Sequence, residues 1–327
     1  MTTNRRQVLT GAAALMLGGM APLARAQAGA DYPTGPVKIV VGFSAGGPTD
    51  LAARLIAAKL QAAFGQTFVV ENKPGAGSNL ASEIVAAAPP DGYTLLMAAA
   101  PIAINGHLYK SLKFDVLKSF EPISQVMSAP CILAVRPDSY KTMAELVAAA
   151  KKEPGKLSYS SSGAGGSQHL AGELLQQKAG IQLIHVPYKG AAPALNDLLG
   201  GQVSMGFMTS LSSVPHFKAG KLRALAVAAP QRLPQLPDVP TMAEVGLPGV
   251  EINSWSGILA PARTSPQVVE KLQREVAKAL AAPDVREKLV AQGAVVVGGT
   301  SAEFTNYLAR EHGEYGRLIK SINLSLD

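Results

Sequence analysis

Short apolar runs rich in β-branched residues alternate along the chain with longer amphipathic stretches. The run over 37–41 is typical of a buried strand, and Ile56, Leu60 and Phe64 then recur every four residues on one helix face. The next expected elements are a helix over 50–64, strands over 67–70 and 93–97, and a helix ending near 88 between those strands. This order predicts a parallel, doubly wound sheet with flanking helices.

The same alternation returns further along the chain, although no internal sequence repeat is evident. The expected elements are strands over 157–160, 183–186, 203–207 and 222–227, and helices over 168–179 and 192–199. A second α/β unit is therefore predicted. The fold class is α/β, with two domains that each contain a doubly wound mixed sheet and flanking helices.

Two extended stretches, 123–135 and 252–259, separate the units and are interpreted as crossover strands of a hinge. The last part, 265–321, is predicted to be mostly helical, beginning with Ser265 as N-cap and Pro266 in the first turn. We expect this tail to pack on the first unit. The predicted domains are 31–128 with 257–327, which is discontinuous, and 129–256.

The composition is that of a folded chain, since 47% of the 327 residues are apolar and only 16% are charged. The net charge is +7, but basic residues are scattered and never form a run of five, so no nucleic-acid partner is expected. Cys131 is the only cysteine, which excludes an intramolecular disulfide and predicts a small buried apolar side chain. We expect a monomer.

The N-terminus has the features of a secretory signal peptide over residues 1–26. Arg5-Arg6 precedes an apolar run over 8–23, and Ala24-Arg25-Ala26 is a small-x-small cleavage pattern before Gln27. The paired arginines resemble a twin-arginine signal, although Asn4 departs from the usual Ser or Thr. A retained membrane anchor is the alternative, but the apolar run is short for a bilayer. Export to the periplasm is expected, with cleavage of the signal.

Three loops rich in Gly, Ser and Ala each connect a predicted strand to a predicted helix. We call them the first loop (43–50), the second loop (75–79) and the third loop (161–168). In a parallel sheet such loops gather at the carboxyl ends of the strands, where ligands bind. Helix starts offer unpaired N–H groups and a partial positive charge, and glycine lets the backbone approach an anion. Loops from two domains could therefore grip a carboxylate; the alternative is that they are connecting turns.

Enzyme and metal chemistry are less well supported by the sequence. Residues 42–46 match the Gly-x-Ser-x-Gly pattern of a serine hydrolase with Ser44 as nucleophile, but this would fall on the first strand, with no upstream oxyanion loop. His169 and Glu173 are interpreted as a helix-surface pair, and His312 as a solvated residue. We expect no catalytic residue, no metal site and no cofactor.

The chain resembles the Bug family, the extracytoplasmic solute receptors of tripartite tricarboxylate transporters. The resemblance begins with the first-loop signature, VGFSAGGPTD at 41–50. It continues through ENKPGAG (71–77), PDGYTLL (90–96), SSSG (160–163), HLAGE (169–173), VPYKG (186–190), KLRALA (221–226) and DVPT (238–241). It implies a two-domain clamshell like a type II periplasmic binding protein, carboxylates held by main-chain N–H groups and water, and membrane transporter subunits as partners in trans. A periplasmic sensor that presents its ligand to a signalling partner is the alternative.

The chain departs from the family pattern at Ser78, in the stretch 98–101 and at Thr209, which we interpret as the variable wall of the cleft. The predicted ligand-binding residues are Phe43, Ser44, Ala45, Gly46, Gly47, Thr49, Asp50, Ser78, Ala99, Ser162, Gly163, Gly166, Ser167 and Thr209. Thr209 replaces an acid that could pair with an ammonium group, so a carboxylate with an uncharged body is expected. Asp50 is expected to cap its own helix outside the cleft.

Overall fold

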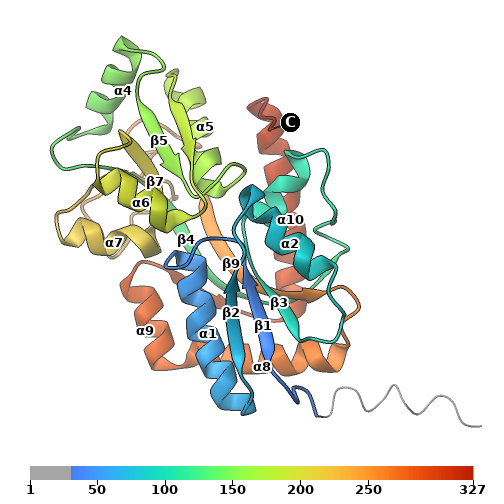
Figure 1. Cartoon of the computed structure of the whole chain (residues 1–327). Helices are drawn as coiled ribbons and strands as arrows, with labels where there is room; N and C mark the ends of the chain where they lie inside the picture. The colour runs from blue at the N-terminus through green and yellow to red at the C-terminus, as the bar shows by residue number, and fades with distance from the viewer. Residues whose placement is uncertain (1–30, 327) are drawn as a thin grey trace, which may run out of the picture.

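The computed structural model describes residues 31–326, so the predicted signal peptide lies outside the described part. Figure 1 shows two α/β halves connected by long strands. The first half contains β1 (Val37–Val41), α1 (Pro48–Phe64), β2 (Phe68–Asn72), η1 (Ala76–Ser78), α2 (Asn79–Ala86), β3 (Thr94–Ala99), α3 (Pro101–Ile104) and η2 (Asn105–His107). The second half contains α4 (Met143–Lys152), β5 (Ser158–Ser161), α5 (Ser167–Ala179), β6 (Ile184–Pro187), α6 (Ala191–Leu199), β7 (Met205–Thr209), α7 (Ser210–Lys218) and β8 (Arg223–Val227).

Each half has the predicted parallel core with antiparallel strands added to it. β1 lies between β2 and β3 and is parallel to both, and β5 is parallel to β6 and β7. The antiparallel strands are β9 (Asn253–Pro261), which pairs with β3, and β4 (Phe120–Val135), which pairs with β7 and β8. The mixed α/β sheet with flanking helices is confirmed.

The two predicted crossover segments are the strands β4 and β9, which run antiparallel to one another from Phe120 opposite Pro261 to Pro130 opposite Asn253. Beyond Pro130, β4 continues into the second half and pairs with β7 from Cys131 onward. At about 3.3 Å per residue, a 16-residue strand is long enough to serve both halves. The strands of the two halves therefore form one continuous sheet through β4.

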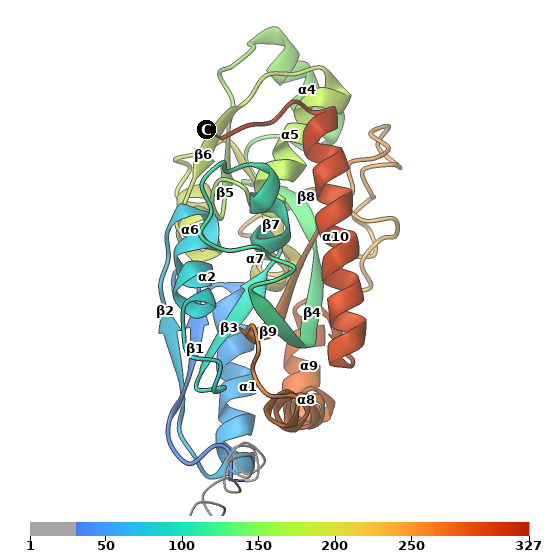
Figure 2. The same cartoon turned by 90° about the vertical axis from the view of Figure 1, so that its right-hand side faces the viewer.

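The C-terminal part packs against the first half. It consists of α8 (Pro266–Ala281), α9 (Pro283–Ala291), β10 (Val295–Gly298) and α10 (Ser301–Ser321). The Ser265 hydroxyl accepts the Val268 amide and caps α8, which packs on α1. In Figure 2, α10 runs alongside β4 and reaches the second half, where the Gln177 side chain donates to the Ser321 carbonyl at 3.1 Å. β10, which was not predicted, pairs with β4.

Strand alternation divides the core between two faces of the sheet. Ile39 and Val41 point toward α1 and α8, whereas Val40 points to the opposite face, in a cluster with residues of α2, α5 and α10. Cys131 is fully buried in this second cluster, as predicted. Within residues 31–326 no helix combines the length and the apolarity that crossing a bilayer requires.

Candidate functional site

The first and third loops have the same local structure, although they lie in different halves. Gly46 and Gly165 both adopt a left-handed conformation, with φ of +83° and +76°. Gly47 and Gly166 follow as extended N-caps, with φ of −83° and −86°, and α1 and α5 begin at the next residue. The similarity extends to sequence, since Ala-Gly-Gly at 45–47 corresponds to Ala-Gly-Gly at 164–166.

In both loops, the side chain of the third residue of the following helix accepts a hydrogen bond from the backbone amide of the left-handed glycine. Asp50 Oδ2 accepts from Gly46 N at 3.0 Å, and His169 Nδ1 accepts from Gly165 N at 3.2 Å. The conformation of each loop is therefore fixed by a side chain four residues after its left-handed glycine. The remaining first-turn amides of the helices have no intrahelical acceptor and are available to a ligand.

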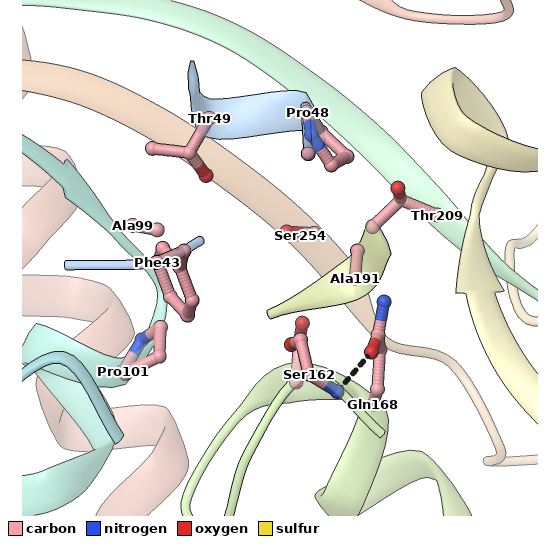
Figure 3. A pocket seen from close by; sticks show the side chains of 12 residues that line it. Phe43, Pro48, Thr49, Ala99, Pro101, Ser162, Gln168, Ala191, Thr209 and Ser254 are labelled. Carbon is pink, nitrogen blue, oxygen red and sulfur yellow. Dashed lines mark hydrogen bonds between the residues drawn. The ribbon is translucent and has the colours of Figure 1, made fainter. Parts of the chain in front are cut away.

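The starts of α1 and α5 meet at a pocket between the halves, shown in Figure 3. Its lining consists of Phe43, Gly47, Pro48, Thr49, Ala99, Pro101, Ser162, Ser167, Gln168, Ala191, Thr209 and Ser254. None of these residues carries a charged side chain. The polar side chains on the walls are hydroxyls and the Gln168 amide. A charged ligand would therefore interact with neutral hydrogen-bonding groups and not with an opposite charge.

Seven of the predicted ligand-binding residues line this pocket: Phe43, Gly47, Thr49, Ala99, Ser162, Ser167 and Thr209. An adjoining cavity, which shares Phe43 and Ser162, is lined by Ser78 and Gly163. The structure does not place Ser44, Ala45, Gly46, Asp50 or Gly166 on the pocket walls. Their positions in the first and third loops make them supports of the walls.

Five lining residues are absent from the predicted ligand-binding set: Pro48, Pro101, Gln168, Ala191 and Ser254. Pro48 and Gln168 belong to the predicted loops, and Pro101 belongs to the stretch 98–101 that was interpreted as a wall of the cleft. Ala191 follows Gly190 at the start of α6, another strand-glycine-helix junction. Ser254 lies on β9, and only the packing of that crossover strand brings it to the pocket.

Asp50 is 3% exposed, and its carboxylate is fully engaged within the first half. Besides the Gly46 amide, it accepts from Arg54 Nε at 3.0 Å and from Asn72 Nδ2 at 2.9 Å. Burial alone would raise the pKa of Asp50, but the hydrogen bonds from Arg54, Gly46 and Asn72 outweigh it and hold that pKa below its ordinary value. Asp50 is therefore an ionised support of the first loop.

The rings of His169, His185 and Tyr159 stack behind the third loop, with His169 and Tyr159 buried and His185 half-buried. The His169 and His185 ring centroids lie 4.0 Å apart, and those of His185 and Tyr159 lie 4.8 Å apart. The helix-surface interpretation of His169 and Glu173 is wrong, because His169 is only 3% exposed, with its Nε2 atom 3.7 Å from Glu173 Oε1. Burial lowers the pKa of His169 to about 4 and that of His185 to about 3.

Comparison with known proteins identifies the chain. A family model described as the tripartite tricarboxylate transporter family receptor matches residues 52–324. The chain belongs to this family. Among curated relatives, it is 38% identical over 324 residues to a UPF0065 protein of Pseudomonas sp. strain P51 (98% of this chain and 96% of the relative). It is 35% identical over 298 residues to the protein BugT of Bordetella pertussis (90% and 91%).

Solved structures of similar proteins share the fold of this receptor. The periplasmic binding protein BugD superposes with a TM-score of 0.87 at 37% identity, covering 90% of this chain and 100% of that one. An R. palustris protein solved with adipate gives 0.86 at 35%, with the same coverage. A Rhodopseudomonas palustris protein solved with bound malate gives 0.83 at 32%, covering 88% and 100%. The family is one of transporter receptors and BugD is a periplasmic binding protein, so the receptor is not an enzyme.

The surroundings of Ser44 agree with this conclusion. Its hydroxyl donates to the Lys189 carbonyl at 2.9 Å, so the acceptor is a main-chain carbonyl and not the histidine that a serine nucleophile needs.

Residues 31–326 contain no cluster of three side chains suited to a metal ion. His312 is not the solvated residue that was expected, because it stacks on His107 at 4.1 Å and its Nδ1 atom lies 3.0 Å from the Ala103 carbonyl.

Proposed function

We propose that this receptor captures a small carboxylate between its two halves and delivers it to the membrane subunits of a tripartite tricarboxylate-type transporter. The observation that carries the proposal is the convergence of two helix starts on a pocket without charged side chains. An anion there is favoured by first-turn amides and by the positive ends of α1 and α5.

The donors come from both sides of the pocket. On α1 they are the amides of Thr49 and Asp50, since Pro48 has no N–H, and on α5 those of Ser167, Gln168 and His169. A carboxylate held by both sets would connect the halves. Phe43, Ala99 and Pro101 supply an apolar wall for an uncharged ligand body. Adipate and malate, which occupy two similar proteins, are carboxylates of this kind.

The halves serve as the two domains of a clamshell in this proposal, with 31–128 and 257–327 in the first and 129–256 in the second. β4 and β9 act as the hinge. The predicted ligand-binding residues act in two ways: those on the walls touch the ligand, and Ser44, Gly46, Asp50 and Gly166 hold the loops. Export would use the signal peptide over 1–26 and would place the receptor in the periplasm.

The test is a thermal-shift screen of the mature protein against mono-, di- and tricarboxylates, followed by calorimetry. A ligand at 100 times its Kd should stabilise the fold by about 2.7 kcal/mol. The matched control is the amide of each hit, which keeps its shape but loses its charge. Absence of stabilisation by every carboxylate, or equal stabilisation by the amides, would contradict the proposal.

A further inference from the structure

The third loop depends on an acceptor that differs chemically from that of the first loop. Asp50 holds Gly46 through a carboxylate whose charge is balanced by Arg54 at 3.0 Å. The equivalent position in α5 is occupied by His169, whose ring nitrogen holds Gly165 without adding a negative charge beside the helix start. A carboxylate at this position would repel a carboxylate ligand, whereas a neutral imidazole does not.

We propose that His169 is a positioning residue for ligand binding, and that its Nδ1 atom keeps the third loop in its ligand-ready conformation by accepting the Gly165 amide. The inference rests on the proposed function, and it assigns a role to a side chain that does not line the pocket. It predicts a neutral ring with its proton on Nε2, because Nδ1 must keep its lone pair.

The contacts of the ring support this tautomer. His169 Nε2 faces Glu173 Oε1 at 3.7 Å, and the same oxygen accepts the Tyr159 hydroxyl at 2.8 Å. Burial lowers the pKa of His169 to about 4, so the ring is neutral at pH 7 and Nδ1 is available as an acceptor. The titratable groups that face the ring are Glu173 on the same helix and His185 on β6, and Tyr159 of β5 bonds to Glu173.

The stacked partner of His169 holds the other end of the loop. His185 Nε2 lies 2.7 Å from Ser161 Oγ, which accepts the Gly163 amide at 3.2 Å. The two stacked imidazoles therefore hold the loop directly at Gly165 and, through Ser161, at Gly163. His169 is buried and His185 is half-buried, and the His185 ring stacks on both His169 and Tyr159, which fixes the two imidazoles in place.

The position of the loop matters for closure of the cleft. Gly165 faces Asn105 of the first half so closely that a side chain at Gly165 would collide with it, and Gly163 approaches Gly77. Gln168, the residue before His169, accepts the Ser162 amide at 2.6 Å through Oε1. Its Nε2 atom remains a donor on the pocket wall. Movement of the loop would disturb both the wall and the contact between the halves.

The experiment compares His169→Asn with His169→Leu. In Asn the side-chain oxygen, like Nδ1 of histidine, is attached to Cγ, so an acceptor is retained; Leu has a similar branch without an acceptor. At pH 7 we expect His169→Leu to bind adipate about tenfold more weakly, because the Gly165 amide loses its buried acceptor and the binding-competent loop conformation is less populated. His169→Asn should stay within about threefold of the unmodified receptor. Equal losses in both variants would overturn the inference.

A measurement without ligand separates this inference from the proposed function. Nitrogen-15 NMR should show the Nε2-protonated tautomer of His169 at pH 7, and the Gly165 amide should exchange at least tenfold faster in His169→Leu than in His169→Asn. Unchanged Gly165 exchange, or the opposite tautomer, would overturn the inference even if adipate binds. If the tautomer and the Gly165 amide exchange are as expected but no carboxylate binds, the result would instead contradict the proposed function.

Discussion

Ser44 of the first half donates both its backbone amide and its hydroxyl to the carbonyl oxygen of Lys189 in the second half, each at 2.9 Å. Beside this contact, Gly190 approaches the Ser44 amide so closely that an added side chain would lie 3.0 Å from it. The first loop thus touches both the pocket and the opposite half. The described structure is a closed arrangement of the two halves.

Ser44→Ala should weaken carboxylate binding only modestly. The substitution removes the hydroxyl donor but keeps the amide bond to Lys189, so the loss should be about 1 kcal/mol or less, as for one exposed hydrogen bond. Calorimetry with the strongest ligand of the screen measures it. Labelling of Ser44 by a fluorophosphonate would show instead that the side chain is an activated nucleophile.

Gly77→Ala should impair closure of the cleft. Gly77 has a φ of +60°, and a Cβ atom there would collide with the Ala164 carbonyl of the opposite half. The matched control is Gly65→Ala, because Gly65 has a φ of +66° and open space around its Cβ position. Both variants should lose about 1–2 kcal/mol of folding stability from the left-handed alanine.

Only Gly77→Ala should lose affinity for a carboxylate, by about tenfold or more, and small-angle scattering with ligand should show a more open particle. Denaturant unfolding and calorimetry on the two variants make the comparison. Equal affinities in Gly77→Ala and Gly65→Ala would mean that binding does not require the contact between Gly77 and Ala164.

Thr209→Asp should shift preference toward ligands with an ammonium group. Thr209 is on the pocket wall and is the N-cap of α7, a position where Asp is well tolerated. The unmodified receptor should bind succinate more tightly than aspartate, because burying an ammonium without an anionic partner costs several kcal/mol. Thr209→Asp should narrow or reverse the ratio of the two affinities.

Thr209→Asn is the control for this change, since it has the shape of Asp without its charge and should leave the ratio near that of the unmodified receptor. Competition calorimetry with the two ligands gives the ratio for each protein. Tighter binding of aspartate by the unmodified receptor would show that the ammonium finds an anion elsewhere in the pocket.

The free energy of unfolding should decrease as pH falls below about 6.5. Burial depresses the pKa of His169 to about 4 and that of His185 to about 3, so the unfolded chain binds protons first. The contribution of the two neutral histidines to stability is fully present above pH 6.5 and is lost as pH falls toward their folded-state pKa values. Between pH 7 and pH 5 the protonation of each histidine in the unfolded chain should lower the free energy of unfolding by about 2 kcal/mol. Urea unfolding of the receptor and of His169→Asn should show a shallower pH dependence for the variant.

The exported protein should begin at or near Gln27. The prediction rests on Arg5-Arg6, on the apolar run over 8–23 and on Ala24-Arg25-Ala26. Mass spectrometry of periplasmic material reads the terminus directly, and Arg5→Lys with Arg6→Lys tests the twin-arginine route. Recovery of an intact Met1 in the periplasmic fraction would contradict cleavage.

Much of the architecture follows from local sequence patterns. The apolar run at 37–41, the apolar positions of α1 and the Ser265-Pro266 start of α8 predicted their elements, because periodicity and capping act over a few residues. The glycine content of the first and third loops likewise identified the two helix starts that meet at the pocket. β10 was missed, since a four-residue strand depends on the partner that β4 provides.

The backbone groups that are free to meet a ligand can be identified from the sequence, because unpaired helix-start amides and left-handed glycines are local properties. The use of the side chains around them depends on long-range packing. Asp50 and His169 share one local geometry, but Asp50 is hydrogen-bonded by Arg54 and Asn72, whereas His169 stacks on the ring of His185. Ser254 and Ala191 reached the pocket through strand crossing and closure of the halves. Burial, partner and protonation state arise from residues far apart in the chain, and no local pattern encodes them.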